Sequence, residues 1–278
     1  SHRVKMKIAV LGANGFIGSY LCTYLWSRGF DVIPVTRQTL DLTNPYSMNI
    51  WINQENPSVI INAAISGGGP TVNDINYEDV RNNLTIFFNF FNATLPIRYI
   101  NIGSGAEFDR QTDIHQVRET EVLYRHPTDS YGFSKNIISR AIREKDNFFT
   151  LRLFGCFHSS EPLTRLFKRF LSGQINSIQD KLFDYFSLAD FSRVIEFYCI
   201  TESTISLPKD INCVYKEKYL LSEILGRINQ IKKLDIPIYT DGKKHLSYTG
   251  HYGYLDMLCT RKDFPELDGL EKGLEQYE

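Results

Sequence analysis

Two side chains able to take part in proton transfer lie four residues apart in the segment YGFSK, Tyr131 and Lys135. Residues at i and i+4 lie on one face of a helix, and the segment 131–145 has a helical pattern. A free tyrosine has a pKa near ~10 and is a poor acid–base group at neutral pH. A neighbouring ammonium favours the phenolate and brings its proton within working range. The pair therefore predicts acid–base chemistry, although an ordinary surface pair has the same spacing.

A glycine-rich turn, GANGFIG, places Gly12, Gly15 and Gly18 between an apolar run at 7–11 and a helical pattern. Glycines at these positions suit a tight turn, the close approach of backbone to a pyrophosphate, and the packing of a helix on a strand. The helix N-terminus offers free N–H groups and a positive dipole end to the phosphates. We therefore expect a dinucleotide site here; the alternative is a glycine turn without a ligand.

The residues that follow the second apolar run, at 31–35, bear on which dinucleotide binds. An NAD site usually carries Asp or Glu there, which accepts hydrogen bonds from the ribose hydroxyls. This chain has Thr36 and Arg37 instead, and Asp31 lies at the opposite end of the run. A guanidinium can bind a 2′-phosphate bidentately and stack on adenine. We predict NADP(H), with NAD(H) as the alternative; Arg37 could also be an ordinary surface arginine.

Short apolar runs alternate with helical segments over the first half of the chain. Strands are predicted at 7–11, 31–35, 57–64, 98–103 and 148–154, with helices at 45–55, about 76–94 and 131–145. This alternation predicts an α/β fold with a Rossmann-type doubly wound parallel sheet. We expect the NADP-binding domain to cover 6–154, with 186–200 returning to it. The smaller C-terminal substrate-binding lobe would comprise 155–185 and 201–278.

Composition limits the class of protein and its partners. The chain has 278 residues, 42% hydrophobic and 23% charged, as in an ordinary soluble globule. A net charge of −1 and the lack of a basic run argue against nucleic acid as a partner. No apolar stretch reaches the roughly 18 residues of a membrane span, so we expect a cytoplasmic protein with no membrane partner. The five cysteines are scattered without CxxC spacing, which predicts reduced thiols and no metal site.

The motifs together resemble the extended short-chain dehydrogenase/reductase superfamily, the group of nucleotide-sugar epimerases, dehydratases and reductases. They fall in the family's order between residue 6 and about 200: GANGFIG (12–18), DL (41–42), NAA (62–64), GSGAEF (103–108), YGFSK (131–135), LRLF (151–154) and DYFSLADF (184–191). The resemblance implies that Ser104, Tyr131 and Lys135 form the catalytic set. Tyr131 would donate or accept the proton, Ser104 would bond the substrate oxygen, and Lys135 would bind the nicotinamide ribose and tune the tyrosine.

The resemblance also implies two wider sets of binding residues. Besides Arg37, Tyr131 and Lys135, the cofactor set contains Gly12, Asn14, Gly15, Phe16, Ile17, Gly18, Asp41, Leu42, Asn62, Ala63, Ala64, Ile65, Asn83, Ile102, Gly103, Leu153 and Phe154. The substrate set contains Gly68, Ser104, Gly105, Tyr131, Phe154, Arg165 and Lys168. The two cations of the second set could equally be the solvated face of an amphipathic helix at 162–172.

The two residues after the catalytic hydroxyl distinguish the reactions of this superfamily. The 4,6-dehydratases that the chain resembles place Asp and Glu there, and enzymes of the fucose-synthase type place Cys at the second position. Here the positions are Gly105 and Ala106, which cannot move a proton. Strand alternation would turn the following Glu107 away. The remaining groups suit the transfer of one hydride and one proton.

The resemblance therefore implies NADPH-dependent reduction of the 4-keto group of a nucleotide-diphosphate 4-keto-6-deoxy sugar, in deoxysugar biosynthesis for a surface polysaccharide. The segments 36–44 and 63–84 resemble the deoxysugar reductases and the fucose synthases, including a glycine-rich loop at Gly67–Gly69. One alternative is a nucleotide-sugar C4 epimerase with retained NAD. Another is a non-catalytic NADP-sensing regulator, although such relatives typically lack the tyrosine or the lysine.

The segment 76–94 is apolar on more than one side, through Val80, Leu84, Phe87, Phe88, Phe90 and Phe91. A helix that is apolar most of the way round must be buried on both sides. Relatives pair this helix and the tyrosine-bearing helix with those of a second subunit, so the resemblance implies a homodimer. Packing within one chain is the alternative.

Overall fold

The computed structural model describes residues 5–64, 76–93, 96–202 and 204–278. Its main sheet has six parallel strands, in the spatial order β2 (Asp31–Val35), β1 (Lys7–Leu11), β3 (Val59–Asn62), β4 (Arg98–Ser104), β6 (Phe148–Leu153) and β9 (Asp210–Cys213). The chain leaves β1 for β2 on one side and returns to β3 on the other. At such a reversal of strand order, a crevice opens beyond the carboxyl ends of the strands.

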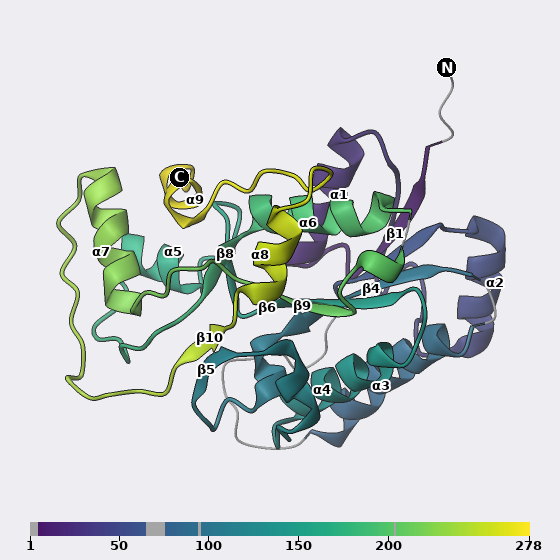
Figure 1. Cartoon of the computed structure of the whole chain (residues 1–278), viewed down its shortest axis with the longest axis horizontal. Helices are drawn as coiled ribbons and strands as arrows, with labels where there is room; N and C mark the ends of the chain where they lie inside the picture. Colours follow the sequence, from purple (N-terminus) through teal and green to yellow (C-terminus); the bar gives the residue numbers. More distant parts are fainter. Residues whose placement is uncertain (1–4, 65–75, 94–95, 203) are drawn as a thin grey trace.

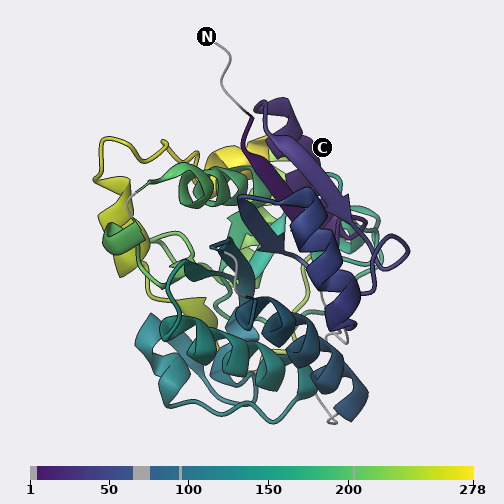
Figure 2. The same ribbon diagram turned by 90° about the vertical axis from the view of Figure 1, so that its right-hand side faces the viewer.

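Helices cover both faces of this sheet (Figures 1 and 2). One face carries α1 (Phe16–Ser27) and α6 (Leu188–Ile200), and the other carries α2 (Pro45–Glu55), α3 (Tyr77–Phe91) and α4 (Ser130–Arg143). Successive side chains of β1 supply the two cores in turn, because a strand alternates its side chains between faces. Ile8 and Val10 pack with α1 and α6, whereas Ala9 and Leu11 pack with α2 and α3. The predicted doubly wound parallel sheet is confirmed.

A separate apolar cluster forms the smaller lobe, seen on the left of Figure 1. It joins α5 (Leu166–Leu171), α7 (Leu221–Lys232) and α9 (Leu270–Glu275). The short strands β7 (Gly155–Phe157) and β8 (Tyr185–Ser187) pair in parallel beside it. Single helical turns complete the connections, η1 (Gly105–Phe108), η2 (Glu119–Leu123) and η3 (Thr204–Ser206).

The structure differs from the predicted domain boundary within 201–278. Strand β9 is part of the main sheet, and α8 (Gly253–Cys259) packs against the core through Leu255 and Leu258. Strand β10 (Tyr248–Gly250) pairs with β5 (Ile114–Val117), which precedes α4 in the chain. These segments are too short to show a periodicity, and long-range pairing fixes their structure.

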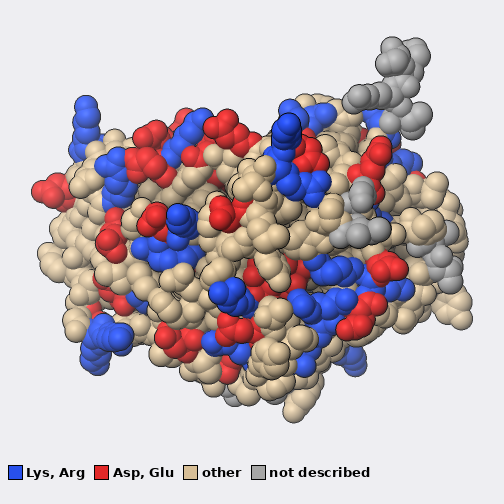
Figure 3. Space-filling view, viewed as in Figure 1, with Lys and Arg blue, Asp and Glu red and all other residues tan. Residues whose placement is uncertain are grey.

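Acidic and basic side chains lie interspersed over the face shown in Figure 3, in keeping with the net charge of −1. In the described part of the chain, no helix combines the length and the apolar character that crossing a membrane requires.

Candidate active site

The glycine turn joins β1 to α1 and lies beside the ends of β2 and β3. The Gly12 and Ala13 N–H groups donate to Val35 O at 3.0 and 3.1 Å. Gly12 has a φ of +73°, and a Cβ there would lie 2.7 Å from Ala63 O; a Cβ on Gly18 would lie 2.0 Å from Gly12 O. The fold itself therefore requires both glycines.

Gly15 has a different environment from the other two glycines of the turn. A Cβ there would meet only Gly12 O, at 3.4 Å, within the described structure. Gly15 is also the N-cap of α1, and its position offers no side-chain acceptor to the N–H groups of the 12-residue helix. An exposed helix N-terminus next to a residue without a side chain fits the pyrophosphate of a dinucleotide.

Ser104 is the last residue of β4 and the N-cap of η1. Its Oγ accepts from Ala106 N at 3.1 Å, and Glu107 Oε2 accepts from Ser104 N at 2.6 Å. This reciprocal capping turns the Glu107 carboxylate behind the strand, where the residue is fully buried. The expected direction of Glu107 is therefore found, but a helical turn sets it rather than strand alternation.

Helix α4 holds Tyr131 against Ser104 by a close contact at its N-terminus. The Asp129 side chain caps the helix, accepting from Gly132 N at 2.8 Å, and a Cβ on Gly132 would lie 2.6 Å from Ala106 O. The Tyr131 and Ser104 side chains line the same cavity. The structure thus brings together the first two residues of the predicted set.

Lys135 completes the set one helical turn after Tyr131. Its Nζ donates to Ile102 O at 2.6 Å and lies 6.0 Å from the centroid of the Tyr131 ring. Burial lowers the pKa of Lys135 to about 8, partly opposed by the Glu107 carboxylate. Burial raises the pKa of Tyr131, while the Ser104 hydrogen bond and the Arg110 guanidinium lower it. A charged lysine therefore stands beside a largely protonated phenol at neutral pH.

The buried ammonium predicts a pH dependence of stability. Because the pKa of Lys135 is about 8 in the folded chain and 10.5 ordinarily, the unfolded chain binds more protons between these values. The free energy of unfolding should therefore rise with pH in that window, relative to Lys135→Met, by about 2–3 kcal/mol. Urea unfolding of both proteins at pH 7 and pH 10 measures the difference. An equal pH dependence in the two proteins would contradict the burial of the charge.

These side chains line a cavity of ≈ 840 Å³ at the carboxyl ends of the strands. Its walls include ten predicted residues: Ile17, Ala63, Ile102, Gly103, Ser104, Tyr131, Lys135, Leu153, Phe154 and Arg165. A cavity of this size can hold a small molecule or a cofactor. Residues of the smaller lobe complete its wall.

The other predicted cofactor residues lie in several different places: in the glycine turn, after β2, in a second crevice and in the core. Asn14 and Phe16 belong to the glycine turn, and Arg37 and Asp41 are exposed after β2. The residues Asn62, Ala64 and Asn83 line a narrow crevice on the other side of Lys135. Leu42 differs, because its side chain is buried in the core with Met48 and Ile52. Ile65 lies outside the described residues, as do Gly68 and the rest of the Gly67–Gly69 loop.

The predicted cations of the lobe have different environments. Arg165 lines the cavity, donates to Cys156 O at 2.9 Å, and lies 5.0 Å from the Phe16 ring centroid. Lys168 lies 5.0 Å from the Tyr277 ring centroid and is not among the residues that line the cavity. The structure brings only Arg165 to the site.

Gly105 has no side chain because two aromatic rings occupy the space beside it. A Cβ there would lie 2.4 Å from Phe154 Cδ1 and 2.8 Å from Tyr248 Cζ. We expect Gly105→Ala to lower the free energy of unfolding by about 1–3 kcal/mol through overpacking. Gly226→Ala is the matched control, since a Cβ at that helical position meets nothing within 4 Å and should stabilise. Urea denaturation compares them; equal effects would contradict the steric argument.

Sequence reasoning missed two residues that face Tyr131 or Ser104. Arg110 lies 5.8 Å from the Tyr131 ring centroid and forms an ion pair with Asp129 at 2.8 Å. Tyr248 lines the cavity together with Ser104, and its Cζ would lie 2.8 Å from a Cβ on the neighbouring Gly105. Arg110 and Tyr248 both follow irregular stretches of the chain. Their spacing in the sequence therefore gives no sign that they lie near the predicted catalytic residues.

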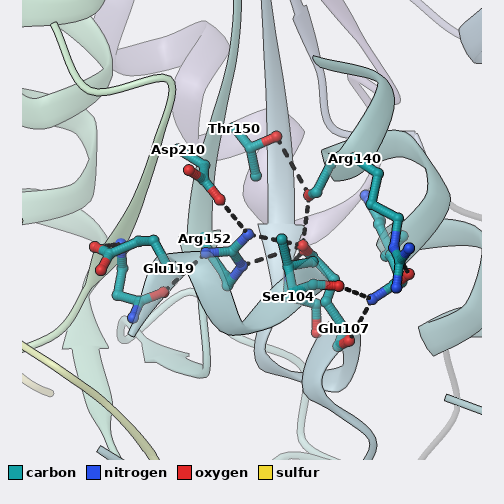
Figure 4. Close-up of polar contacts among 12 residues, drawn as sticks. Ser104, Glu107, Glu119, Arg140, Thr150, Arg152 and Asp210 are labelled. Carbon is teal, nitrogen blue, oxygen red and sulfur yellow. Dashed lines mark hydrogen bonds and ion pairs between the residues drawn. The ribbon is translucent and has the colours of Figure 1, made fainter. Parts of the chain in front are cut away.

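A buried charge network supports the Ser104 turn from behind (Figure 4). Arg152 Nη2 lies 2.9 Å from Glu107 Oε1 and 3.0 Å from Asp210 Oδ2, and its Nη1 donates to Asn212 Oδ1 at 2.9 Å. Ser139 also donates to Glu107. Because Glu107 accepts from Ser104 N, the network fixes the backbone that carries the Ser104 hydroxyl.

Comparison with known proteins gives a family match. Residues 8–189 match the profile of the NAD dependent epimerase/dehydratase family. The chain is 25% identical over 256 residues to "GDP-6-deoxy-D-talose 4-dehydrogenase" of Aggregatibacter actinomycetemcomitans, covering 85% of this chain and 86% of that protein. It is 24% identical over 139 residues to "Spore coat polysaccharide biosynthesis protein SpsK" of Bacillus subtilis (strain 168), covering 49% and 48%.

Solved structures share the fold over almost the whole chain. The GDP-mannoheptose C4 reductase MlghC of Campylobacter jejuni, with NADP bound, has a TM-score of 0.76 at 18% identity, covering 99% of this chain and 98% of that one. The dTDP-4-dehydrorhamnose reductase of Bacillus anthracis str. Ames, in complex with NADP, has a TM-score of 0.78 at 17% identity, covering 100% and 99%.

Proposed function

Because the chain belongs to the NAD dependent epimerase/dehydratase family, we propose that it is an NADP-dependent oxidoreductase that reduces the 4-keto group of a nucleotide-diphosphate 4-keto-6-deoxy sugar. The observation that carries the proposal is that Ser104, Tyr131 and Lys135 line one cavity, with the Lys135 ammonium 6.0 Å from the centroid of the Tyr131 ring. Gly105 and Ala106, which follow Ser104, cannot move a proton, so neither serves elimination of water or epimerisation next to a ketone. The set suffices for the addition of one hydride and one proton.

The chemistry of each residue follows from its place. The Gly12–Gly18 turn would hold NADPH, which would supply the hydride for the carbonyl carbon. Ser104 donates a hydrogen bond to the carbonyl oxygen, and Tyr131 transfers its phenolic proton to that oxygen to give the alcohol. The Lys135 ammonium, 6.0 Å from the Tyr131 ring centroid, stabilises the phenolate left behind.

The names of similar proteins support the substrate class. One relative is a GDP-6-deoxy-sugar 4-dehydrogenase, and two structures of the same fold are a C4 reductase and a 4-dehydrorhamnose reductase, both with NADP. The relative from spore coat polysaccharide biosynthesis supports a role in making a surface polysaccharide.

The proposal is tested by NADPH oxidation at 340 nm with GDP-, dTDP-, CDP- and UDP-linked 4-keto-6-deoxy sugars. NADPH loss with one of them, and a new alcohol at C4 by NMR, is the expected result. NADPH binding without turnover of any ketone would instead favour a regulator. Interconversion of two nucleotide hexoses without added NADPH would establish an epimerase.

Arg37 should decide the preference for NADPH over NADH. It is exposed two residues after Val35, whose carbonyl oxygen accepts from Gly12 N and Ala13 N. Removing a cation that binds the 2′-phosphate should raise the KM for NADPH about tenfold or more and leave that for NADH unchanged. Steady-state kinetics of Arg37→Ala with both cofactors measures this, and an unchanged preference would refute the assignment.

We also propose a homodimer that pairs α3 and α4 of two chains. The two helices pack side by side on one face of the sheet, and Tyr77 and Phe133 are 78% and 39% exposed. Light scattering tests this, and a stable monomer would refute it.

A further inference from the structure

Arg110 lies beside Tyr131 in the wall of the cavity. Its Cζ lies 5.8 Å from the centroid of the Tyr131 ring, and Lys135 Nζ lies 6.0 Å from the same centroid. All three side chains line the cavity. The phenol therefore has two cations at similar distances, although the sequence predicts only the lysine.

The turn that carries Arg110 continues the local structure that carries Ser104. The helical turn η1 begins directly after Ser104, and Asp109 then turns the chain with a φ of +72°. Asp109 N donates to Ala106 O at 3.2 Å, and Thr112 N donates to Asp109 O at 3.0 Å. A guanidinium on a backbone held in this way has a defined position relative to the Ser104 turn.

An ion pair with Asp129 holds the guanidinium near Tyr131. Arg110 Nη2 lies 2.8 Å from Asp129 Oδ2, and the same oxygen accepts from Gly132 N at 2.8 Å at the start of α4. Within the described residues, Arg110 Nε and Asp129 Oδ1 are both buried without a hydrogen-bond partner, so the pair is not bidentate. The two side chains are 20% and 5% exposed, so solvent screens the guanidinium little. Its charge can therefore act on Tyr131.

The two cations differ in how long they keep their charge as the pH rises. Burial lowers the pKa of Lys135 to about 8, whereas a guanidinium stays protonated throughout the working range. Arg110 is thus a permanent cation beside the phenol. The other ionisable groups that face the phenol include Glu107 of η1, Asp129 at the start of α4, Cys156 of β7 and Tyr248 of β10. Burial raises the pKa of both Cys156 and Tyr248, which keeps them neutral.

We propose that Arg110 is a positioning residue, a second cation that stabilises the Tyr131 phenolate left when the phenolic proton moves to the substrate oxygen. In that step the phenolic O–H bond breaks, the proton goes to the carbonyl oxygen, and the negative charge stays on the tyrosine. Asp129 fixes the guanidinium and offsets part of its charge. The effect on turnover rests on the proposed function, whereas the interaction with Tyr131 does not.

The test follows the ionisation of Tyr131 without substrate. With 3,5-difluorotyrosine in place of Tyr131 in the full chain, ¹⁹F NMR gives the titration midpoint of that one phenol. Asp129→Asn is the background, because asparagine still caps α4 and no unpaired carboxylate remains when the guanidinium is removed. In this background, Arg110→Met and Arg110→Gln should each raise the midpoint by about one pH unit. Arg110→Lys keeps the charge and should raise it by less than about half as much.

A midpoint that stays unchanged or falls in either neutral variant would overturn the proposal. A rise of the same size in Arg110→Lys would assign the effect to shape rather than charge, and would overturn it too. Arg227→Met is the matched control for net charge, since that side chain is 44% exposed on α7, and it should leave the midpoint unchanged.

Turnover gives a second readout. With the ketone that the NADPH assay identifies, Arg110→Met should lower kcat about three- to tenfold and leave the KM for NADPH unchanged. The alkaline limit of kcat should move to higher pH together with the NMR midpoint. If no ketone is reduced, the proposed function fails while the NMR titration still decides the role of Arg110.

Discussion

Tyr131→Phe should lower kcat for ketone reduction by about 10³-fold while NADPH binding stays close to that of the native protein. The substitution removes only the phenolic oxygen of a residue that lines the cavity together with Ser104. Without it, the developing alkoxide has no positioned proton donor, although Ser104 can still donate a hydrogen bond. Stopped-flow or steady-state NADPH oxidation measures kcat, and fluorescence titration measures NADPH binding.

The control for this experiment is Tyr124→Phe, because Tyr124 is exposed and remote from the cavity lining. It should keep the native kcat. Retention of more than about a tenth of the native kcat by Tyr131→Phe would exclude the tyrosine as the proton donor. It would also give new weight to the regulator, in which Tyr131 serves no chemical step.

The parts of the site that sequence predicts are those set by local spacing. Gly18 is fixed within one turn by its 2.0 Å approach to Gly12 O, Gly12 by its φ of +73°, and Tyr131 and Lys135 by one turn of α4. Residues a few positions apart keep a fixed arrangement in the folded chain, because the geometry of a helix or turn determines which of them share a face. The doubly wound sheet can also be predicted from local patterns, because short apolar runs alternate with helical segments along the chain.

The parts that sequence does not predict depend on contacts between distant segments. Tyr248 meets Ser104 only because β10 pairs with β5, more than a hundred residues earlier. Strand β9 belongs to the main sheet only because it pairs in parallel with β6. Such pairings leave no periodic signal in short segments, so a lone tyrosine or a four-residue strand carries no sign of its position.

Gly105 illustrates how a sequence feature changes meaning in the structure. From the sequence, it is a missing acid–base group after the catalytic hydroxyl. In the structure, the rings of Phe154 and Tyr248 take up its space. The absence of a side chain at this position therefore also has a packing reason, which only the folded chain shows.

Arg152→Met should lower the free energy of unfolding by about 3–5 kcal/mol, the largest loss of stability expected in this molecule. Arg152 is fully buried, and its guanidinium contacts the carboxylates of Glu107 and Asp210 at 2.9 and 3.0 Å. Methionine replaces much of its volume but leaves two buried carboxylates without their shared cation. Urea denaturation measures the loss, and kcat should also fall, because Glu107 positions Ser104 N.

Two further variants distinguish lost charge pairing from lost packing. Arg227→Met breaks the pair of Arg227 with Glu271, whose side chains are 44% and 50% exposed, and should leave the unfolding midpoint nearly unchanged. Asp210 keeps its ion pair with Arg143 at 2.5 Å, so adding Glu107→Gln to Arg152→Met removes the unpaired charge and should recover part of the stability. If the double variant is less stable than Arg152→Met alone, loss of packing and hydrogen bonds outweighs the unpaired charge, and the network stabilises the Ser104 turn by its shape rather than its electrostatics.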